Sequence, residues 1–192
     1  MSGVRQQIIE TTCDLLESQG FHATGLTQIV KESGAPKGSL YYYFPEGKDE
    51  IAEAAITWAG QTVAERIRAG LAVSDDAAIA LCAFVNEIAT AVERSGFRRG
   101  GPLTTVAMET ATTNQRLNHA CQTAYTLLQA AFATKLIAGG YAQAKAEKLA
   151  TFITAAIEGG IMLSRTYHTG APLRLVDPGV NKVPYFYHDV HE

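Results

Sequence analysis

The chain has few charged residues for its length and no excess of positive charge. Its 192 residues carry 16 Lys and Arg against 19 Asp and Glu, which gives a formal net charge of −3. Binding to nucleic acid through bulk electrostatic attraction is therefore excluded, and any DNA contact must depend on a few well-placed cations. Hydrophobic residues make up 47% of the chain and charged residues 18%. These proportions exclude a disordered chain and predict a folded protein with a large core.

Cysteine is scarce, and long apolar runs are missing. Cys13, Cys82 and Cys121 each lie in an apolar, helical context, and no secretory hydrophobic segment follows Met1. We therefore expect buried, reduced thiols in a cytoplasmic protein, with oxidant sensing as the alternative. The longest uncharged stretch, residues 117–134, contains several polar side chains, which argues against a membrane span or a membrane partner.

Signatures of common enzymes and metal sites are also missing. The chain has no Gly-x-Ser-x-Gly, His-Glu-x-x-His, Walker loop or Cys-x-x-Cys. Its histidines have no metal-binding spacing, and only His188 and His191 with Asp189 could hold an adventitious ion. We expect no enzymatic activity, no cofactor and no metal. A small helical enzyme that uses Glu109 and His119 is a rival interpretation.

Alanine-rich segments with apolar residues three and four apart predict an all-helical chain. The expected helices cover about 4–19, 25–33, 36–44, 48–72, 75–95, 103–112, 114–138 and 142–168, and Ser74 or Asp75 should cap the fifth. From about residue 169 the prolines and clustered aromatics predict an extended tail. The expected domains are 1–47 for DNA binding, 48–72 as a connecting helix, 73–170 for a ligand and dimerisation, and 171–192 as an irregular tail.

Residues 25–50 have the layout of two short helices joined by a glycine turn. Gly34 permits the sharp turn. Leu40 and Phe44, four residues apart, face inward, which leaves Lys37 and most of the neighbouring tyrosines facing outward. A helix-turn-helix protein places its second helix in the major groove of DNA, so this segment predicts DNA binding. A three-helix module whose tyrosines pack against a partner protein is the alternative.

The same segment carries a family pattern, formed by Gly20-Phe21, Thr24, Ile29, Gly34, Lys37-Gly38-Ser39-Leu40-Tyr41, Phe44 and Lys48. This pattern resembles the N-terminal domain of TetR-family transcriptional repressors. One extra residue, Gly47, precedes Lys48, and this variant is similar to the LmrA/YxaF-like branch, as are Gly101–Glu109 and Ile157–Gly160. Beyond about Leu173 the chain departs from the family pattern. The resemblance implies an all-α fold with an N-terminal helix-turn-helix domain and a C-terminal ligand-binding and dimerisation domain.

The resemblance also implies three sets of site residues. Those expected to contact DNA are Thr27, Gln28, Lys37, Gly38, Ser39, Tyr41, Tyr42, Tyr43 and Lys48. Those expected to line a pocket for a small hydrophobic or aromatic inducer are Trp58, Phe84, Met108, Asn118, Tyr125 and Phe152, for each of which ordinary core packing is the alternative. Those expected at a homodimer interface are Ile153, Ala156, Ile157, Gly160 and Ile161, with packing inside one chain as the alternative.

The function that follows is sequence-specific repression. The protein is expected to bind a palindromic operator in double-stranded DNA as a homodimer and to leave it when an inducer binds, and the resemblance suggests an efflux or detoxification gene as the target. A ligand-independent adaptor with its cavity filled by side chains is the rival within the same fold.

Overall fold

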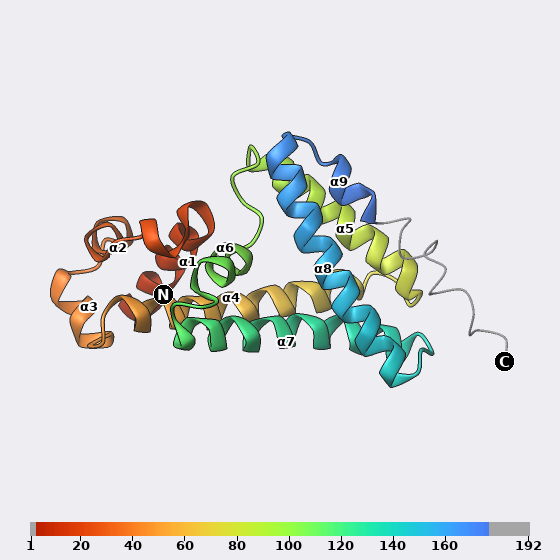
Figure 1. Cartoon of the computed structure of the whole chain (residues 1–192), viewed down its shortest axis with the longest axis horizontal. Coiled ribbons are helices and arrows are strands. Elements are labelled where there is room, and N and C mark those ends of the chain that lie inside the picture. The colour runs from red at the N-terminus through yellow and green to blue at the C-terminus, as the bar shows by residue number, and fades with distance from the viewer. Residues whose placement is uncertain (1–2, 177–192) are drawn as a thin grey trace. The chain divides into compact units, whose positions relative to one another are not determined.

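A computed structural model of the chain describes residues 3–176. Within this range the protein is entirely helical, which confirms the predicted fold class (Figure 1). The helices are α1 (Val4–Ala23), α2 (Leu26–Ser33), α3 (Lys37–Tyr43), α4 (Lys48–Leu71), α5 (Ala77–Arg94), α6 (Pro102–Thr110), α7 (Gln115–Ala138), α8 (Gln143–Tyr167) and α9 (Ala171–Arg174).

Two helix boundaries differ from the prediction. Gly20 leaves helical geometry at φ 80° and ψ 178°, as its predicted stop requires, but helix α1 resumes and continues to Ala23. The cap of α5 is Asp76, not Ser74 or Asp75, because the Asp76 carboxylate accepts hydrogen bonds from the first free N–H groups of that helix, at 2.8 and 3.0 Å.

The predicted irregular tail begins too early. Ala171–Arg174 forms the short helix α9, and Leu173 is fully buried. Burial of Leu173 explains why these residues form a helix, and Pro172 lies in the first turn of that helix, where proline is tolerated. The rest of the predicted tail, residues 177–192, lies outside the described residues.

The chain divides into two compact units. Among the described residues, the first unit takes in residues 3–63 together with Gly101–Leu127, and the second takes in Ala64–Gly100 together with residues 128–176. The first unit therefore holds α1, α2, α3, α6 and the first parts of α4 and α7. This division groups α6 with the helix-turn-helix through its contacts with α1 (Figure 1). The functional boundaries after residues 47 and 72 stay a prediction.

The first unit has an aliphatic and aromatic core to which each of its N-terminal helices contributes. Its largest fully buried side chains include Ile8 and Leu16 of α1, Ile29 of α2, Leu40 of α3, Phe44, and Ile51 and Ile56 of α4. Each such side chain contributes about 1.5–3 kcal/mol on burial, so the short helices α2 and α3 are held by packing rather than by their own propensity.

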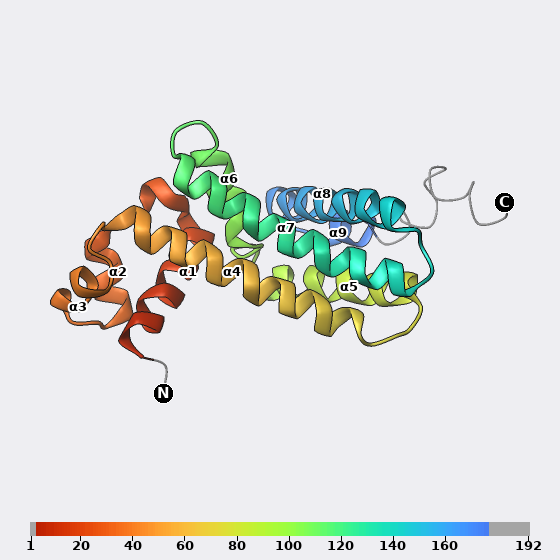
Figure 2. The same ribbon diagram turned by 90° about the horizontal axis from the view of Figure 1, so that it is seen from below.

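The second unit packs α5, α8 and α9 together with parts of α4 and α7. Phe84 of α5 meets Phe132 of α7 edge to face, with ring centroids 6.2 Å apart. Helix α9 lies beside α8 (Figure 2), where Gly160 leaves room for Leu173: a Cβ at Gly160 would lie within 3.3 Å of that residue. An ion pair from Arg174 to Glu93 ties α9 to α5.

Candidate nucleic-acid interface

Helices α2 and α3 are joined by a turn whose geometry the sequence dictates. Gly34 ends α2 in the left-handed region at φ 65° and ψ 9°, which glycine adopts without strain. Ala35 is buried, and the extended Pro36 precedes the first residue of α3. Leu40 and Phe44 are both fully buried, as predicted. These two anchors turn the opposite face of α3 toward the surface of the first unit.

Three consecutive tyrosines dominate the exposed face of α3. Tyr42 is 79% exposed, Tyr41 and Tyr43 are also exposed, and Ser39 is half-buried. The rings of Tyr42 and Tyr43 meet edge to face at 5.0 Å. An aromatic ring as exposed as that of Tyr42 gains nothing from the core, and its apolar body and polar tip suit a surface that offers both methyl groups and phosphate oxygens.

Lys37 and Gly38 begin α3, and both are exposed. Apart from its two neighbours and the backbone of its own helix, no heavy atom of residues 3–176 lies within 4 Å of the place where a Cβ on Gly38 would stand. A glycine inside a helix costs roughly 0.5–1 kcal/mol relative to alanine. Packing within the chain therefore does not require glycine at position 38. Its lack of a side chain leaves space at the surface of α3 for another molecule.

The start of α2 holds the other two predicted contacts in the helix-turn-helix. Thr27 is exposed. Gln28 is already engaged within the chain: its Oε1 accepts from Gln19 Nε2 at 2.8 Å, and its Nε2 donates to Glu32 Oε1 at 2.8 Å. Gln28 therefore has a role in fixing α2 against α1 whether or not it contacts DNA.

Lys48 begins α4 and is held against the end of α1. Its Nζ lies 4.2 Å from the centroid of the Phe21 ring and donates to the carbonyl of His22 at 3.5 Å. Burial lowers the pKa of Lys48, and the nearby Asp49 and Glu109 carboxylates oppose that shift. The predicted phosphate contact is thus a cation with a fixed position rather than a freely moving side chain.

Sequence reasoning missed the contribution of Glu109 to this region. Its Oε2, on α6, accepts hydrogen bonds from the backbone N–H of Phe21 at 2.6 Å and of His22 at 3.2 Å. In the opposite direction, Glu17 of α1 accepts from the N–H of Gly101 at 2.8 Å. The two carboxylates join α1 and α6 at both ends of their contact. The rival enzyme interpretation assigned Glu109 to catalysis, whereas the structure uses it to complete the backbone hydrogen bonding after Gly20.

The residues predicted for a ligand pocket are divided between the units. Trp58, Met108, Asn118 and Tyr125 belong to the first unit, and Phe84 and Phe152 to the second. The Tyr125 hydroxyl lies 3.3 Å from that of Thr104, which links α7 to α6.

Two of these residues are not enclosed by the chain. Met108 is 80% exposed and Phe152 is 44% exposed. Met108 faces outward because Leu103 and Val106, which are buried, occupy the inner face of α6. An enclosed pocket covers its lining, so neither side chain has the burial that the pocket interpretation expected.

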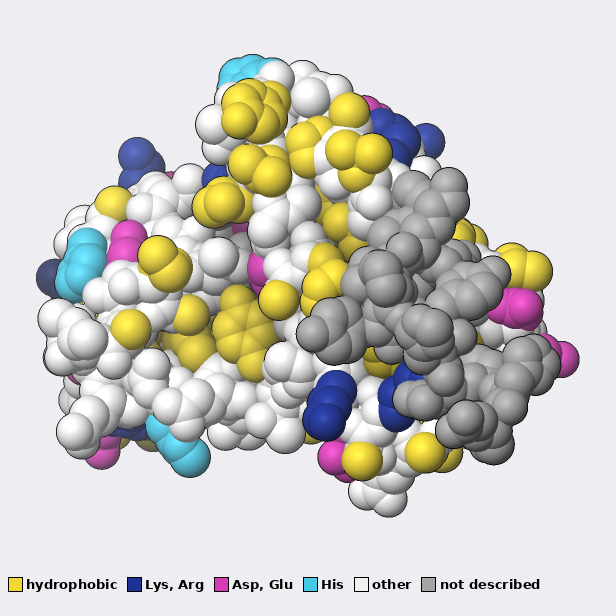
Figure 3. Space-filling view, turned by 45° about the vertical axis from the view of Figure 1, so that its right-hand side comes forward, with side chains coloured by type: hydrophobic (Ala, Val, Ile, Leu, Met, Phe, Trp, Pro, Cys, Tyr) yellow, Lys and Arg dark blue, Asp and Glu magenta, His cyan; other side chains and the backbone are white. Residues whose placement is uncertain are grey.

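The residues predicted for a dimer interface lie mostly on the inner face of α8. Ile153, Ile157 and Gly160 are buried within the second unit, whereas Ala156 and Ile161 are half-buried. The buried three already pack inside the chain, which was the alternative interpretation. Phe152, Met162, Leu163 and Tyr167 are the large hydrophobic side chains that α8 exposes. Figure 3 shows hydrophobic side chains gathered near the top of its view, where α8 ends.

Residues 3–176 offer neither a helix suited to a membrane nor a cluster suited to a metal ion. None of the described helices combines the length and the apolar character that a bilayer span needs. No group of three or more His, Cys, Asp or Glu residues in this range could hold a metal ion. The possible adventitious site at His188, Asp189 and His191 lies outside the described residues.

Comparison with known proteins gives matches over most of the chain. Residues 8–55 match the family "Bacterial regulatory proteins, tetR family", and residues 77–178 match "Transcriptional regulator LmrA/YxaF-like, C-terminal domain". The chain is 42% identical to an uncharacterised HTH-type transcriptional regulator, YxaF of Bacillus subtilis, over 90% of each chain. It is 36% identical to the HTH-type transcriptional regulator LmrA of the same organism, over 88% of this chain and 90% of LmrA.

Solved structures show the same fold. The crystal structure of a regulatory protein TetR from Rhodobacter sphaeroides superposes with a TM-score of 0.81 and 22% sequence identity, over 92% of this chain and 96% of that one. At this identity the likeness concerns the fold alone.

Proposed function

Since the chain belongs to the TetR family of bacterial transcriptional regulators, with a C-terminal domain of the LmrA/YxaF-like type, we propose that it is a repressor that a small hydrophobic or aromatic inducer releases from a palindromic operator. As a member of this family it is a DNA-binding regulator and not an enzyme. We further propose that it acts in the cytoplasm on an efflux or detoxification gene, as the family resemblance suggests.

The exposed face of α3 carries the proposal. Lys37 can donate to guanine O6 and N7, and Gly38 lets the backbone approach the bases. The ring of Tyr42 can meet a thymine methyl or the sugar backbone, while Ser39 and Tyr41 can reach phosphate oxygens. Burial of the other face of α3 supports this assignment, because a recognition helix must hold its position while it reads base edges.

The remaining contacts would position the protein on the duplex. Thr27, near the free amides at the start of α2, suits a phosphate, as does Tyr43 through its hydroxyl. Lys48 would bring one cation close to a phosphate while it stays on the Phe21 ring. With few cations available, affinity depends on these fixed placements.

A palindromic operator requires two copies of α3. Two recognition helices must meet major grooves about 34–36 Å apart or a multiple of that spacing, which one chain cannot do. We propose that the homodimer forms through the exposed face of α8, which carries Phe152, Ala156, Met162, Leu163 and Tyr167. Ile161 lies on another side of the helix, against Gly100, and is not part of this face. Exposed large apolar side chains on one helix support this assignment.

Release by an inducer would be a coupling free energy between two sites. The dimer has one state whose α3 helices match the grooves and another whose α3 helices do not. An inducer that binds the second state more tightly lowers operator affinity by the difference between its binding free energies for the two states. Helices α4 and α7 each begin in the unit that contains α3 and continue into the other unit, so either can carry the change.

The first test is a gel shift with the DNA upstream of the protein's own gene, at two salt concentrations and with non-specific competitor. Wild-type protein should give a discrete shift that resists competitor. Lys37→Ala and Tyr42→Ala should abolish that shift without unfolding the protein. Lys148→Ala, which removes an exposed lysine from α8, is the matched control and should bind like the wild type. Wild-type affinity in both α3 variants would contradict the assignment of the recognition helix.

The dimer proposal has its own test in sedimentation velocity. Leu163→Asp places a charge on the exposed face of α8 and should give monomers that no longer bind the operator. Ile79→Asp, at an exposed apolar position of α5, should leave the dimer intact. A dimer that survives Leu163→Asp would exclude this face.

A further inference from the structure

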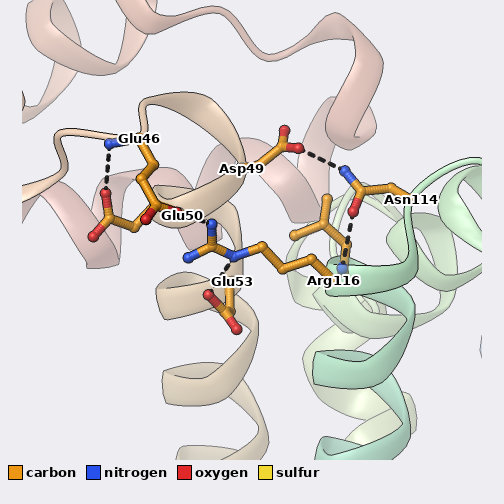
Figure 4. A network of polar contacts seen from close by, with 7 residues as sticks. Glu46, Asp49, Glu50, Glu53, Asn114 and Arg116 are labelled. Carbon is orange, nitrogen blue, oxygen red and sulfur yellow. Dashed lines mark hydrogen bonds and ion pairs between the residues drawn. The ribbon is translucent and has the colours of Figure 1, made fainter.

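Four carboxylates gather immediately after the proposed recognition helix. Glu46 lies in the turn between α3 and α4, and Asp49, Glu50 and Glu53 lie on the first turns of α4 (Figure 4). Like charges at this spacing repel one another, and they stand beside a helix that is proposed to approach phosphates. Nothing on α4 itself neutralises all four.

The partners of Glu46, Asp49 and Glu53 come from the start of α7, about sixty to seventy residues further along the chain. Arg116 donates from Nε to Glu53 at 2.6 Å and from Nη1 to Glu46. Asn114 donates from Nδ2 to Asp49 at 2.8 Å, and its Oδ1 caps α7 by accepting from the N–H of Leu117 at 3.1 Å. The hydrogen bonds to Glu46 and Glu53 raise the pKa of Arg116.

The turn that carries Glu46 has few backbone hydrogen bonds of its own. Pro45 has no N–H to donate. Gly47 donates to the carbonyl of Phe44 at 3.1 Å, and the N–H of Glu46 is satisfied by the Glu50 carboxylate at 2.9 Å. The Arg116 bridge therefore joins this turn to the body of α4. It begins at Glu46, two residues after the buried anchor Phe44 that follows α3.

We propose that Arg116 is a positioning residue of the DNA interface, which sets the end of α3 against α4 by bridging Glu46 and Glu53. This inference rests on the proposed function, because it assigns α3 to DNA. A planar guanidinium can hold two carboxylates in fixed directions, whereas an ammonium is a single point of charge. Arg116 and Glu53 are half-buried and Glu46 is exposed, so solvent screens the bridge. The bridge therefore adds little to overall stability and acts mainly on geometry.

The experiment measures affinity for the operator and for unrelated DNA, at several salt concentrations, together with a thermal melt. Arg116→Gln should lower operator affinity by about tenfold, in the range of coupling between contacting side chains, while affinity for unrelated DNA changes little. Arg116→Lys should likewise lose most of the ratio of operator to unrelated affinity. Because this variant keeps the positive charge, it also serves as the test if Arg116→Gln folds poorly. Arg66→Gln breaks a comparable exposed ion pair, with Glu87 in the second unit, and should change neither affinity.

Charge reversal tests positioning through the ratio of the two affinities. Arg116→Glu combined with Glu46→Arg and Glu53→Arg rebuilds the bridge with reversed signs and changes the net charge of the three residues from −1 to +1. The added positive charge should strengthen binding to both DNAs alike, whereas the rebuilt bridge should restore most of the ratio of operator to unrelated affinity.

Two outcomes would overturn the inference. A lower melting temperature with unchanged operator affinity would leave Arg116 a purely structural residue. Equal losses on both DNAs, with the salt slope reduced by about 0.9, would make Arg116 a phosphate contact itself. A wild-type protein that fails to shift its operator would instead refute the proposed function, before any variant is compared.

Discussion

Replacing Gly20 by alanine should be among the most destabilising single changes in the first unit. The residue adopts φ 80° and ψ 178°, a backbone conformation that residues other than glycine rarely adopt. A Cβ there would lie 2.9 Å from the Glu109 Cδ and closer still to one of its oxygens. Alanine therefore meets both a strained backbone and an occupied space.

The magnitude follows from these two costs. The backbone conformation costs about 1–3 kcal/mol. Relief of the clash displaces the Glu109 carboxylate from the N–H groups of Phe21 and His22, and each bond to a charged group is worth about 1.5–3 kcal/mol. Water can replace part of this loss because the site is partly exposed. The free energy of unfolding should therefore fall by about 3–5 kcal/mol, a large share of the 5–15 kcal/mol typical of a domain.

Urea denaturation followed by far-UV circular dichroism measures this change. Gly38→Ala is the matched control, because it lies in helix α3 where a Cβ meets nothing, and it should be slightly stabilising. In the double variant with Glu109→Ala the clash is absent and the hydrogen bonds are lost only once. The double variant should thus cost less than the sum of its parts. A Gly20→Ala protein within 0.5 kcal/mol of the wild type, or strict additivity, would refute the reasoning.

Three further predictions concern other sites. Gly38→Ala should raise the free energy of unfolding by roughly 0.5–1 kcal/mol yet weaken operator binding in the gel shift. Burial raises the pKa of Cys121 to about 11, so this thiol should resist a thiol reagent at pH 8 until urea unfolds the chain. The hydrogen bond from Arg174 lowers the pKa of Glu93 below its ordinary 4.5. Its stabilising effect is therefore complete above that value and lost as pH falls through the folded-state pKa, and denaturation of Arg174→Gln should show a weaker acid dependence.

Local features of the sequence were sufficient to predict the helix-turn-helix. Gly34 and Pro36 mark the turn, and the spacing of Leu40 and Phe44 decides which face of α3 is inside. Both signals act over a few residues, so they survive without knowledge of the rest of the chain.

The inner face of α8 could not be predicted in the same way. Apolar and small residues occur all around this helix. Ile153, which is buried, and Met162, which is exposed, lie on opposite sides of it, and each fits a hydrophobic stripe along its own side. Packing of α8 against α5, and of Gly160 against Leu173 of α9, decides the side. The contact with Leu173 involves a segment for which the sequence predicted no helix.

Contacts between distant carboxylates and their partners were equally invisible. Glu109 binds the N–H of Phe21 across 88 positions, and Arg116 binds Glu46 across 70. A charged residue on a helix surface is ordinarily solvated, so the sequence alone does not show that Glu109 and Arg116 have partners within the chain. A free backbone N–H after a glycine break such as Gly20 is the one signal that could have suggested a carboxylate nearby.

The division of the chain also decides how this protein can be cut or recombined. The unit that contains α3, the proposed recognition helix, is assembled from two separate stretches, up to Val63 and Gly101–Leu127. A gene fragment that stops after α4 would lack α6 and the start of α7, and with them Glu109, Asn114 and Arg116. The excised fragment would leave the amides after Gly20 and the carboxylates of α4 without their partners. A chimaera that exchanges the second unit while it keeps the first intact therefore needs three junctions, within α4, at Gly100–Gly101 and within α7, rather than one.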